Sequence, residues 1–261
     1  MTSSKIDQEA KSQLLIWAAK RCFETGLQTN AGGNLSIRLE SREAILIKPS
    51  GIGFNECTPD NLQIVHMNGD VDPSPYKPSK DLDFHLAIYR TRPDVNAIVH
   101  CHSPWATGYA SAGREIPCLT VQTIEKLGRM PLIPLAKNGG PQTDVEISPV
   151  FEEKSVKSAV LANHGTIAVG ADMREAQYLA EIIEETAHIA FVRDVLSSAT
   201  TSQSVPCQST AQQQVHKLMS RLSWSRRLGH RVKVYSINEL RGYGNDNRST
   251  FFRGFPSQGG A

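Results

Sequence analysis

The chain has 261 residues, of which 39% are hydrophobic and 21% are charged, and its net charge is +2. This composition is typical of a globular protein with one substantial core, and the small net charge indicates no particular class of partner. No apolar run approaches the roughly 20 residues that cross a bilayer. No nucleic-acid-binding module is evident either, so we expect neither a membrane nor a nucleic acid as a partner.

The N-terminal stretch MTSSKIDQEAKSQ lacks the apolar centre of a signal peptide. The five cysteines are odd in number, and no two of them have CxxC spacing. Disulfide frameworks belong to oxidising compartments, so we expect a soluble protein of the reducing cytoplasm.

The N-terminal part of the sequence predicts one helix followed by short strands. Apolar residues recur at helical spacing over residues 7–26, and Gly26 supplies the stop. A glycine-rich turn leads into an alternating strand over 30–39, and a second strand follows over 43–53. Residues 62–72 predict a strand with an Asn-Gly turn, which is a strong hairpin signal.

Helices and strands alternate along the next part of the chain. Residues 77–95 predict a helix with Ser79 as its N-cap, acidic residues in its first turn and Pro93 at its end. Further strands are predicted at 96–102, 114–121 and 129–136, and a pair of strands with a turn at 160–170. Further helices are predicted at 103–113, 148–159 and 172–196. We therefore expect a single α/β domain.

The composition changes near residue 198. The stretch SSATTSQSVPCQSTAQQQ is rich in Ser, Thr and Gln, which is typical of a linker. From residue 201 onward the formal charge is +7, against −5 for the rest of the chain. We expect a domain over 1–198 and a linker with a basic extension over 199–261, for which a neighbouring subunit is one candidate packing surface.

Two histidines, His100 and His102, lie two residues apart in the stretch AIVHCHSPWATG. Side chains i and i+2 of a strand point the same way, so the two imidazoles share a face. His164 follows another predicted strand and precedes a glycine. Three neutral imidazoles suit zinc, iron, cobalt or nickel, and Asp81, 19 residues before His100, could serve as fourth ligand or general base. The alternative interpretation is a solvated strand face.

Three polar turns at the ends of predicted elements form a second feature. They are NAGGNLS with Gly33 and Asn34, KPSGIG with Ser50 and Gly51, and KPSKD with Ser79 and Lys80. Backbone N–H groups in such turns bind anions, and a lysine adds a point charge. Together they predict a phosphate or carboxylate pocket, whereas each alone is only a turn.

These residues together resemble the class II aldolase/adducin family, which includes fuculose-phosphate aldolase and ribulose-phosphate 4-epimerase. The matching stretches are GGNLSIR, KPSGI, PSKDLDFHLAIYRTRPDVNAIVHCHSPWATGYA and NHGTIAVG, within residues 10–195. The resemblance implies a three-layer α/β/α sandwich around a mainly antiparallel sheet. It also implies a homotetramer with active sites at subunit interfaces.

The resemblance also implies roles for individual residues. His100, His102 and His164 are expected to hold one divalent metal ion per subunit, with zinc first and Fe(II) next. Asp81 is expected as ligand or base, and the turn residues Gly33, Asn34, Ser50, Gly51 and Ser79 are expected to bind phosphate. In this family the ion acts as a Lewis acid that stabilises an enediolate.

The sequence departs from the aldolase pattern at several positions. The acid is Asp81 instead of Glu, and Lys80 replaces a second phosphate-binding serine. Val121 stands where the fuculose-phosphate aldolase has a proton-donating tyrosine, and Glu125 is the nearest candidate acid or base. The basic C-terminal extension is a further difference, and its Tyr235 or Tyr243 could reach a neighbouring site.

The leading hypothesis is a metal-dependent lyase that cleaves or forms a C–C bond in a small sugar phosphate or a related hydroxy-ketone or keto acid. One alternative is a non-haem iron oxygenase acting on an aromatic hydroxy or keto acid. A second is an epimerase or decarboxylase of the same family, because one fold supports several reactions. The last is a non-catalytic scaffold like adducin, whose basic tail binds an acidic partner.

Overall fold

A computed structural model describes residues 3–134 and 143–201. The helices are α1 (Ser3–Glu24), η1 (Phe54–Glu56, a 3-10 turn), α2 (Leu82–Thr91), α3 (Pro104–Ser111), α4 (Val121–Lys126), α5 (Thr143–Phe151) and α6 (Met173–Thr201). The strands are β1 (Asn34–Arg38), β2 (Ala44–Ile47), β3 (Gln63–His66), β4 (Ala97–Cys101), β5 (Leu132–Ile133), β6 (Ser158–Leu161) and β7 (Gly165–Gly170).

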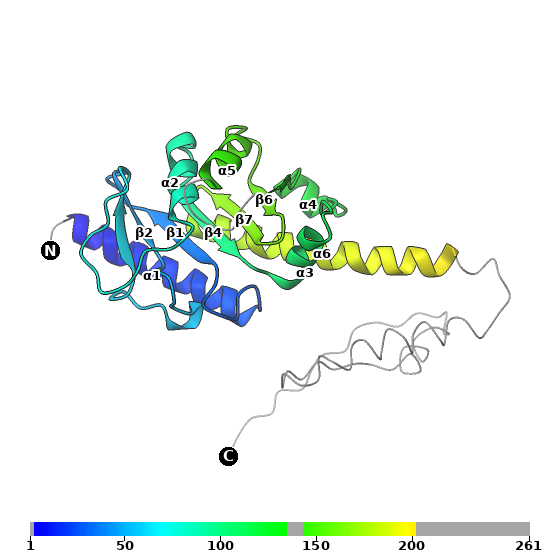
Figure 1. The fold of residues 1–261 in the computed structure, drawn as a ribbon, viewed down its shortest axis with the longest axis horizontal. Coiled ribbons are helices and arrows are strands. Elements are labelled where there is room, and N and C mark those ends of the chain that lie inside the picture. The colour runs from blue at the N-terminus through cyan, green and yellow to red at the C-terminus, as the bar shows by residue number, and fades with distance from the viewer. Residues whose placement is uncertain (1–2, 135–142, 202–261) are drawn as a thin grey trace, which may run out of the picture. The chain divides into compact units, whose positions relative to one another are not determined.

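Within the described residues these strands form one seven-stranded sheet in the order β3-β2-β1-β4-β7-β6-β5 (Figure 1). Neighbouring strands are antiparallel, except that β5 runs parallel to β6. Strand β4, which carries His100 and is followed directly by His102, lies at the centre between β1 and β7. His100 is thereby paired with Asn34 on one side and with Ile167 on the other.

Helices cover both faces of the sheet. One buried apolar cluster joins α1, α3 and α6 to the sheet, and it includes Leu15, Val99 and Ile183. A second cluster joins α2 and α5 to the opposite face, and it includes Phe84 and Phe151. The three-layer α/β/α sandwich around a mainly antiparallel sheet is therefore confirmed.

Local sequence explains where two helices begin and end. Ser103 has extended backbone angles, and Pro104 occupies the first turn of α3, where a missing N–H costs nothing. The helix α2 ends at Thr91, two residues before Pro93, since a residue that precedes proline avoids helical angles. It begins at Leu82 with Asp81 as its N-cap, so the prediction of Ser79 as the cap was wrong.

Two predicted strands were wrong or too long. Residues 114–121 form no strand, and the Thr120 side chain instead accepts a hydrogen bond from the N–H of Thr123 and starts α4. Of the strand predicted over 129–136, only β5 forms within the described residues 129–134, because Pro131 and Pro134 on either side have no N–H for the ladder.

The helix predicted over 148–159 was wrong in its second half. That segment wraps around the guanidinium of Arg92, which donates hydrogen bonds to the carbonyls of Phe151, Glu153, Lys154 and Val156. Satisfying one buried cation in this way holds the carbonyls out of a helical ladder.

At its C-terminal end α6 continues to Thr201, past the predicted boundary at 198. The chain divides into two units, Met1–Ser202 and Gln203–Ala261. The predicted basic extension and its tyrosines lie outside the described residues from 202 onward. Among the described residues, no helix is long and apolar enough to cross a membrane.

Candidate metal centre

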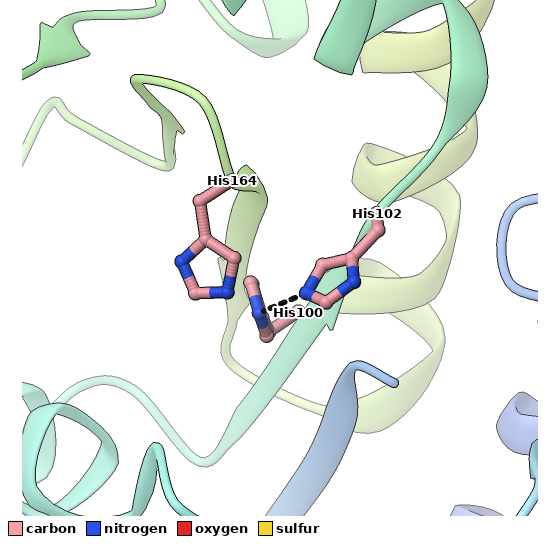
Figure 2. A group of neighbouring side chains, drawn as sticks. All are labelled: His100, His102 and His164. Carbon is pink, nitrogen blue, oxygen red and sulfur yellow. Dashed lines mark hydrogen bonds between the residues drawn. The ribbon is translucent and has the colours of Figure 1, made fainter. Parts of the chain in front are cut away.

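Three imidazoles meet where β4 and the β6–β7 turn end at the same edge of the sheet. His100 is in β4, His102 follows it directly, and His164 lies in the turn between β6 and β7 (Figure 2). One ring nitrogen from each residue lies within 4.8 Å of the others. The Nε2 atoms of His100 and His102 are 3.2 Å apart.

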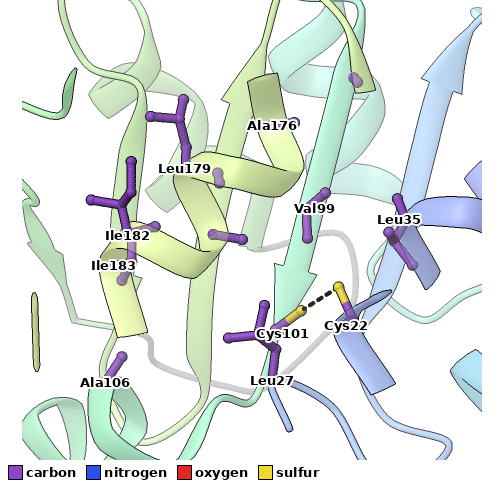
Figure 3. Packing of buried hydrophobic residues seen from close by; sticks show 14 of the residues in the cluster. Cys22, Leu27, Leu35, Val99, Cys101, Ala106, Ala176, Leu179, Ile182 and Ile183 are labelled. Atoms are coloured by element: carbon purple, nitrogen blue, oxygen red, sulfur yellow. Dashed lines mark hydrogen bonds between the residues drawn. The ribbon is translucent and has the colours of Figure 1, made fainter. Parts of the chain in front are cut away.

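Strand geometry explains how HxH can serve this site. Cys101, between the two histidines, points to the opposite face, where it packs with Cys22 and Leu27 in the core under α1 and α6 (Figure 3). Its Sγ lies 3.7 Å from that of Cys22. The alternation of side chains thus assigns the histidines to the site and the cysteine to the core.

The three rings have the chemistry of metal ligands. Burial lowers the pKa of His100, His102 and His164 below the usual 6.5, because it disfavours the charged ring. The rings are therefore neutral at pH 7, which is the form that binds metal ions. Nδ1 of His100 donates to the carbonyl of Thr166 at 2.9 Å, so its Nε2 keeps a free lone pair on the side of the cluster. This donor set fits a divalent ion.

Asp81 lies beside the cluster. Its Oδ2 is 3.7 Å from Nε2 of His100 and accepts a hydrogen bond of 2.7 Å from Nδ2 of Asn34. Burial alone would raise the pKa of Asp81, but His100 and the hydrogen bond from Asn34 outweigh it, and the pKa lies below its usual value. A buried, ionised carboxylate next to three neutral imidazoles can bind a cation or take up a proton.

Two glycines allow the close packing around His102. A Cβ on Gly165 would lie 2.4 Å from the carbonyl oxygen of Cys101 and 2.9 Å from Cδ2 of His102. A Cβ on Gly32 would lie 2.9 Å from Nδ1 of His102. Any side chain at either position would displace this ring.

Comparison with known proteins identifies the family. Residues 13–191 match the family model described as Class II Aldolase and Adducin N-terminal domain. The chain belongs to this family. Class II aldolases use a divalent metal ion, and the histidine triad of this chain suits one.

Curated class II aldolase relatives carry out different reactions. A 5-deoxy-D-ribulose 1-phosphate aldolase of Bacillus thuringiensis serovar kurstaki is 33% identical over 185 residues, covering 70% of this chain and 85% of the relative. A 3-oxo-tetronate 4-phosphate decarboxylase of Haemophilus influenzae is 31% identical over 187 residues, covering 70% and 87%. An L-ribulose-5-phosphate 4-epimerase of Salmonella paratyphi B is 32% identical over 177 residues, covering 64% and 78%.

A solved structure of L-fuculose 1-phosphate aldolase superposes with a TM-score of 0.67 at 29% identity, covering 75% of this chain and 89% of that one. The resemblance and the fold class predicted from the sequence are thus confirmed. The family is one of enzymes whose members include aldolases, decarboxylases and epimerases.

Several residues predicted to bind substrate in this class II aldolase domain come together. The Asn34 amide donates to Oγ of Ser79 at 2.9 Å as well as to Asp81. Oγ of Ser50 donates to the carbonyl of Pro78 at 3.0 Å, which joins the second turn to the third. The structure therefore gathers the three predicted anion turns around the edge of the histidine cluster.

The glycines at these turns have different roles. Gly33 has a φ of +60°, and a Cβ there would lie 2.7 Å from the carbonyl oxygen of His100. Gly51 has a φ of +79° with open space around it. Lys80 is exposed, so its ammonium is available to an anion in solution.

Glu125 is not brought into the cluster within the described chain. It lies exposed on α4, without a hydrogen bond or ion pair to the three histidines or Asp81 among the described residues. Val121, at the start of α4, is 71% exposed. An acid-base role for Glu125 stays a prediction.

Sequence reasoning missed two buried residues that support the site. Nζ of Lys48 donates to the carbonyls of Ala31, Pro49 and Ile52, which ties the first two turns together, and burial lowers its pKa. Oε1 of Gln28 accepts from the backbone N–H of His102 at 2.7 Å. The signal for Lys48 was a lysine directly after the apolar strand AILI; nothing marked Gln28.

Proposed function

We propose that this chain is a metal-dependent lyase that cleaves or forms a C–C bond in a small sugar phosphate or a related hydroxy-ketone or keto acid. The observation that carries the proposal is the cluster of three neutral imidazoles beside a buried, ionised Asp81. A divalent ion held there, zinc first and Fe(II) second, would supply Lewis acidity toward a chelating carbonyl and hydroxyl, as needed for an enediolate.

The chain's own residues would then perform the remaining tasks. His100, His102 and His164 hold the ion, and Asp81 takes up or returns a proton at its carboxylate. The turns with Gly33, Asn34, Ser50, Gly51 and Ser79 bind the phosphate through backbone N–H groups and hydroxyls, and Lys80 adds positive charge. The gathering of these turns beside the cluster supports this division of roles.

A second candidate is decarboxylation of a 3-oxo acid phosphate. The specific observation is the exposed Val121 in place of a proton-donating tyrosine, together with the decarboxylase relative at 31% identity. Loss of CO2 breaks a C–C bond without removal of a hydroxyl proton, so it demands less acid-base machinery than aldol cleavage. Epimerisation by cleavage and readdition would need a proton removed in the cleavage step and returned in the readdition step.

We propose that the protein acts as a cytoplasmic homotetramer with its sites at subunit interfaces, as the family resemblance implies. Exposed apolar residues gather on the C-terminal half of α6, including Phe191, Val192 and Leu196. Such a stripe is typical of a surface that a partner covers. Light scattering of the full chain would give the number of subunits.

The first experiment is metal analysis of protein purified without a His-tag, without oxygen and without added metal. About one zinc ion per chain, followed by turnover of a ketose phosphate or a 3-oxo acid phosphate, would support the proposal. About one iron ion per chain, with oxygen uptake on aromatic hydroxy or keto acids, would favour the oxygenase instead. No metal uptake on titration would refute both and favour a scaffold.

A further inference from the structure

A buried network of hydrogen bonds leads from Tyr89, near the C-terminal end of α2, to Asp81. The OH of Tyr89 lies 2.8 Å from Oγ of Ser36, which lies 2.7 Å from Nδ1 of His85. Nε2 of His85 lies 2.5 Å from Oδ1 of Asn34, whose Nδ2 donates to Asp81 at 2.7 Å. All five residues are buried.

Two regular spacings in the sequence place the residues of this hydrogen-bond network together. Asp81, His85 and Tyr89 follow one another at i, i+4 and i+8 and therefore lie on one face at α2. Asn34 and Ser36 are at i and i+2 of β1 and point to the same face of the sheet. The two rows interleave where α2 packs on β1.

The contacts of the Asn34 amide determine which atom donates and which accepts in each hydrogen bond of the network. Both N–H groups of its amide are used, one toward Ser79 and one toward Asp81, so its Oδ1 accepts and Nε2 of His85 donates. Burial lowers the pKa of His85 to about 4, so the ring is neutral at pH 7 and carries that one proton. Nδ1 then accepts from Ser36, which in turn accepts from Tyr89.

His85 does not reach the metal-binding histidines. The ring of Phe84 stands between, stacked on His85 at 4.6 Å and edge-on to His100 at 5.5 Å. The hydrogen-bonded route from His85 to Asp81 therefore passes through Asn34.

We propose that His85 is a positioning residue, which fixes the Asn34 carboxamide with its amino group toward Asp81 and its oxygen away from it. This inference rests on the proposed function in that Asp81 performs the proton transfer. Without a donor at His85, the amide can turn by 180° and present its oxygen to the carboxylate, which removes the hydrogen bond that holds Asp81 in place.

Three variants separate this role from a packing role. His85→Leu removes the donor, whereas His85→Gln keeps an amide donor where Nε2 stands. Thr91→Val is the matched control, because it removes a side-chain hydrogen bond between α2 and Ser148 that has no connection to Asp81. Thermal unfolding and metal content are measured for each.

The first readout needs no activity. In uniformly 15N-labelled full-length protein, we expect the His85 shifts of a neutral ring protonated at Nε2. We also expect the side-chain amide protons of Asn34 to exchange at least about tenfold faster in His85→Leu, and at the wild-type rate in His85→Gln and Thr91→Val. A ring protonated at Nδ1, or unchanged exchange in His85→Leu, would overturn the proposal even if no substrate were found.

The second readout is a double-mutant cycle on the metal-loaded enzyme. We expect His85→Leu to lower kcat about tenfold or more, with KM and metal content within about threefold of wild type, and His85→Gln to restore most of kcat. In an Asn34→Ala background the same substitution should lower kcat by less than about twofold. Losses that multiply in the double variant, or no rescue by glutamine, would overturn the proposal.

Discussion

His100 donates its Nδ1–H to the backbone carbonyl of Thr166 across the β4–β7 pair, at 2.9 Å. The acceptor belongs to the sheet, so the orientation of the ring is set by the same register that builds the core. The free Nε2 then faces His102 and lies within 3.7 Å of Asp81. The ring of His100 is consequently held in place by the central strands of the sheet.

Removal of one imidazole should weaken metal binding roughly 100-fold. A structural zinc site with four ligands binds with an apparent ~10–16 kcal/mol, so one ligand is worth about 3 kcal/mol, or roughly 100-fold in affinity. We expect His102→Ala to lose about that much, measured by competition with a chromophoric chelator. His66→Ala is the control, since His66 pairs with Asp72 outside the cluster. Equal affinities in the two variants would argue against the site.

Gly165→Ala should damage the site without touching a ligand. The added Cβ would lie 2.4 Å from the carbonyl oxygen of Cys101 and 2.9 Å from the ring of His102. Forcing β4 and β7 apart should cost about 2 kcal/mol of unfolding free energy and weaken metal binding. Gly108→Ala is the matched control, because it has open space in α3 and should stabilise by up to about 1 kcal/mol. Denaturant unfolding of both variants, with and without zinc, measures the two effects; equal stabilities would contradict the steric argument.

The α/β class and the shared face of the two histidines were predictable from periodic signals, whereas the three-layer sandwich was predicted from the resemblance to a known family. HxH at the end of a strand fixes a shared face, and His164 reaches that face because the β6–β7 turn leads directly into β7, the neighbour of β4. The contacts of Gln28 and Arg92 were not predictable, because each residue binds backbone carbonyls or N–H groups far away in sequence. The prediction of a strand over 114–121 was wrong because local propensity says nothing about whether a sheet edge is available for pairing.

Asp81→Asn should separate metal binding from catalysis. The amide keeps the shape of the side chain but cannot take up a proton, so we expect kcat to fall by about 10²–10⁴. Metal content should persist, because the three histidines supply the ligands. Asp81→Glu retains the carboxylate with one more methylene and should keep measurable turnover. Loss of the metal in Asp81→Asn would instead make Asp81 a fourth ligand.

The stability of the metal-free protein should fall in mild acid because of His85. Burial lowers its pKa from 6.5 to about 4, so the unfolded chain binds more protons between these values than the folded chain does. The contribution of the neutral His85 ring to the free energy of unfolding is therefore fully present above pH 6.5, and it is lost as the pH falls toward 4. Between pH 7 and pH 5 the loss from this one ring is about 2 kcal/mol.

His85→Gln isolates that contribution, since glutamine keeps a donor to Asn34 but does not titrate. Its unfolding free energy, measured with urea at pH 7 and pH 5, should fall by about 2 kcal/mol less than that of the wild type. His100, His102 and His164 also have lowered pKa values and act in the same direction, so both proteins should still lose stability. Identical pH dependence in the two proteins would mean that His85 becomes protonated without unfolding, and that the chain of hydrogen bonds through Ser36 and Asn34 rearranges to accept the second proton.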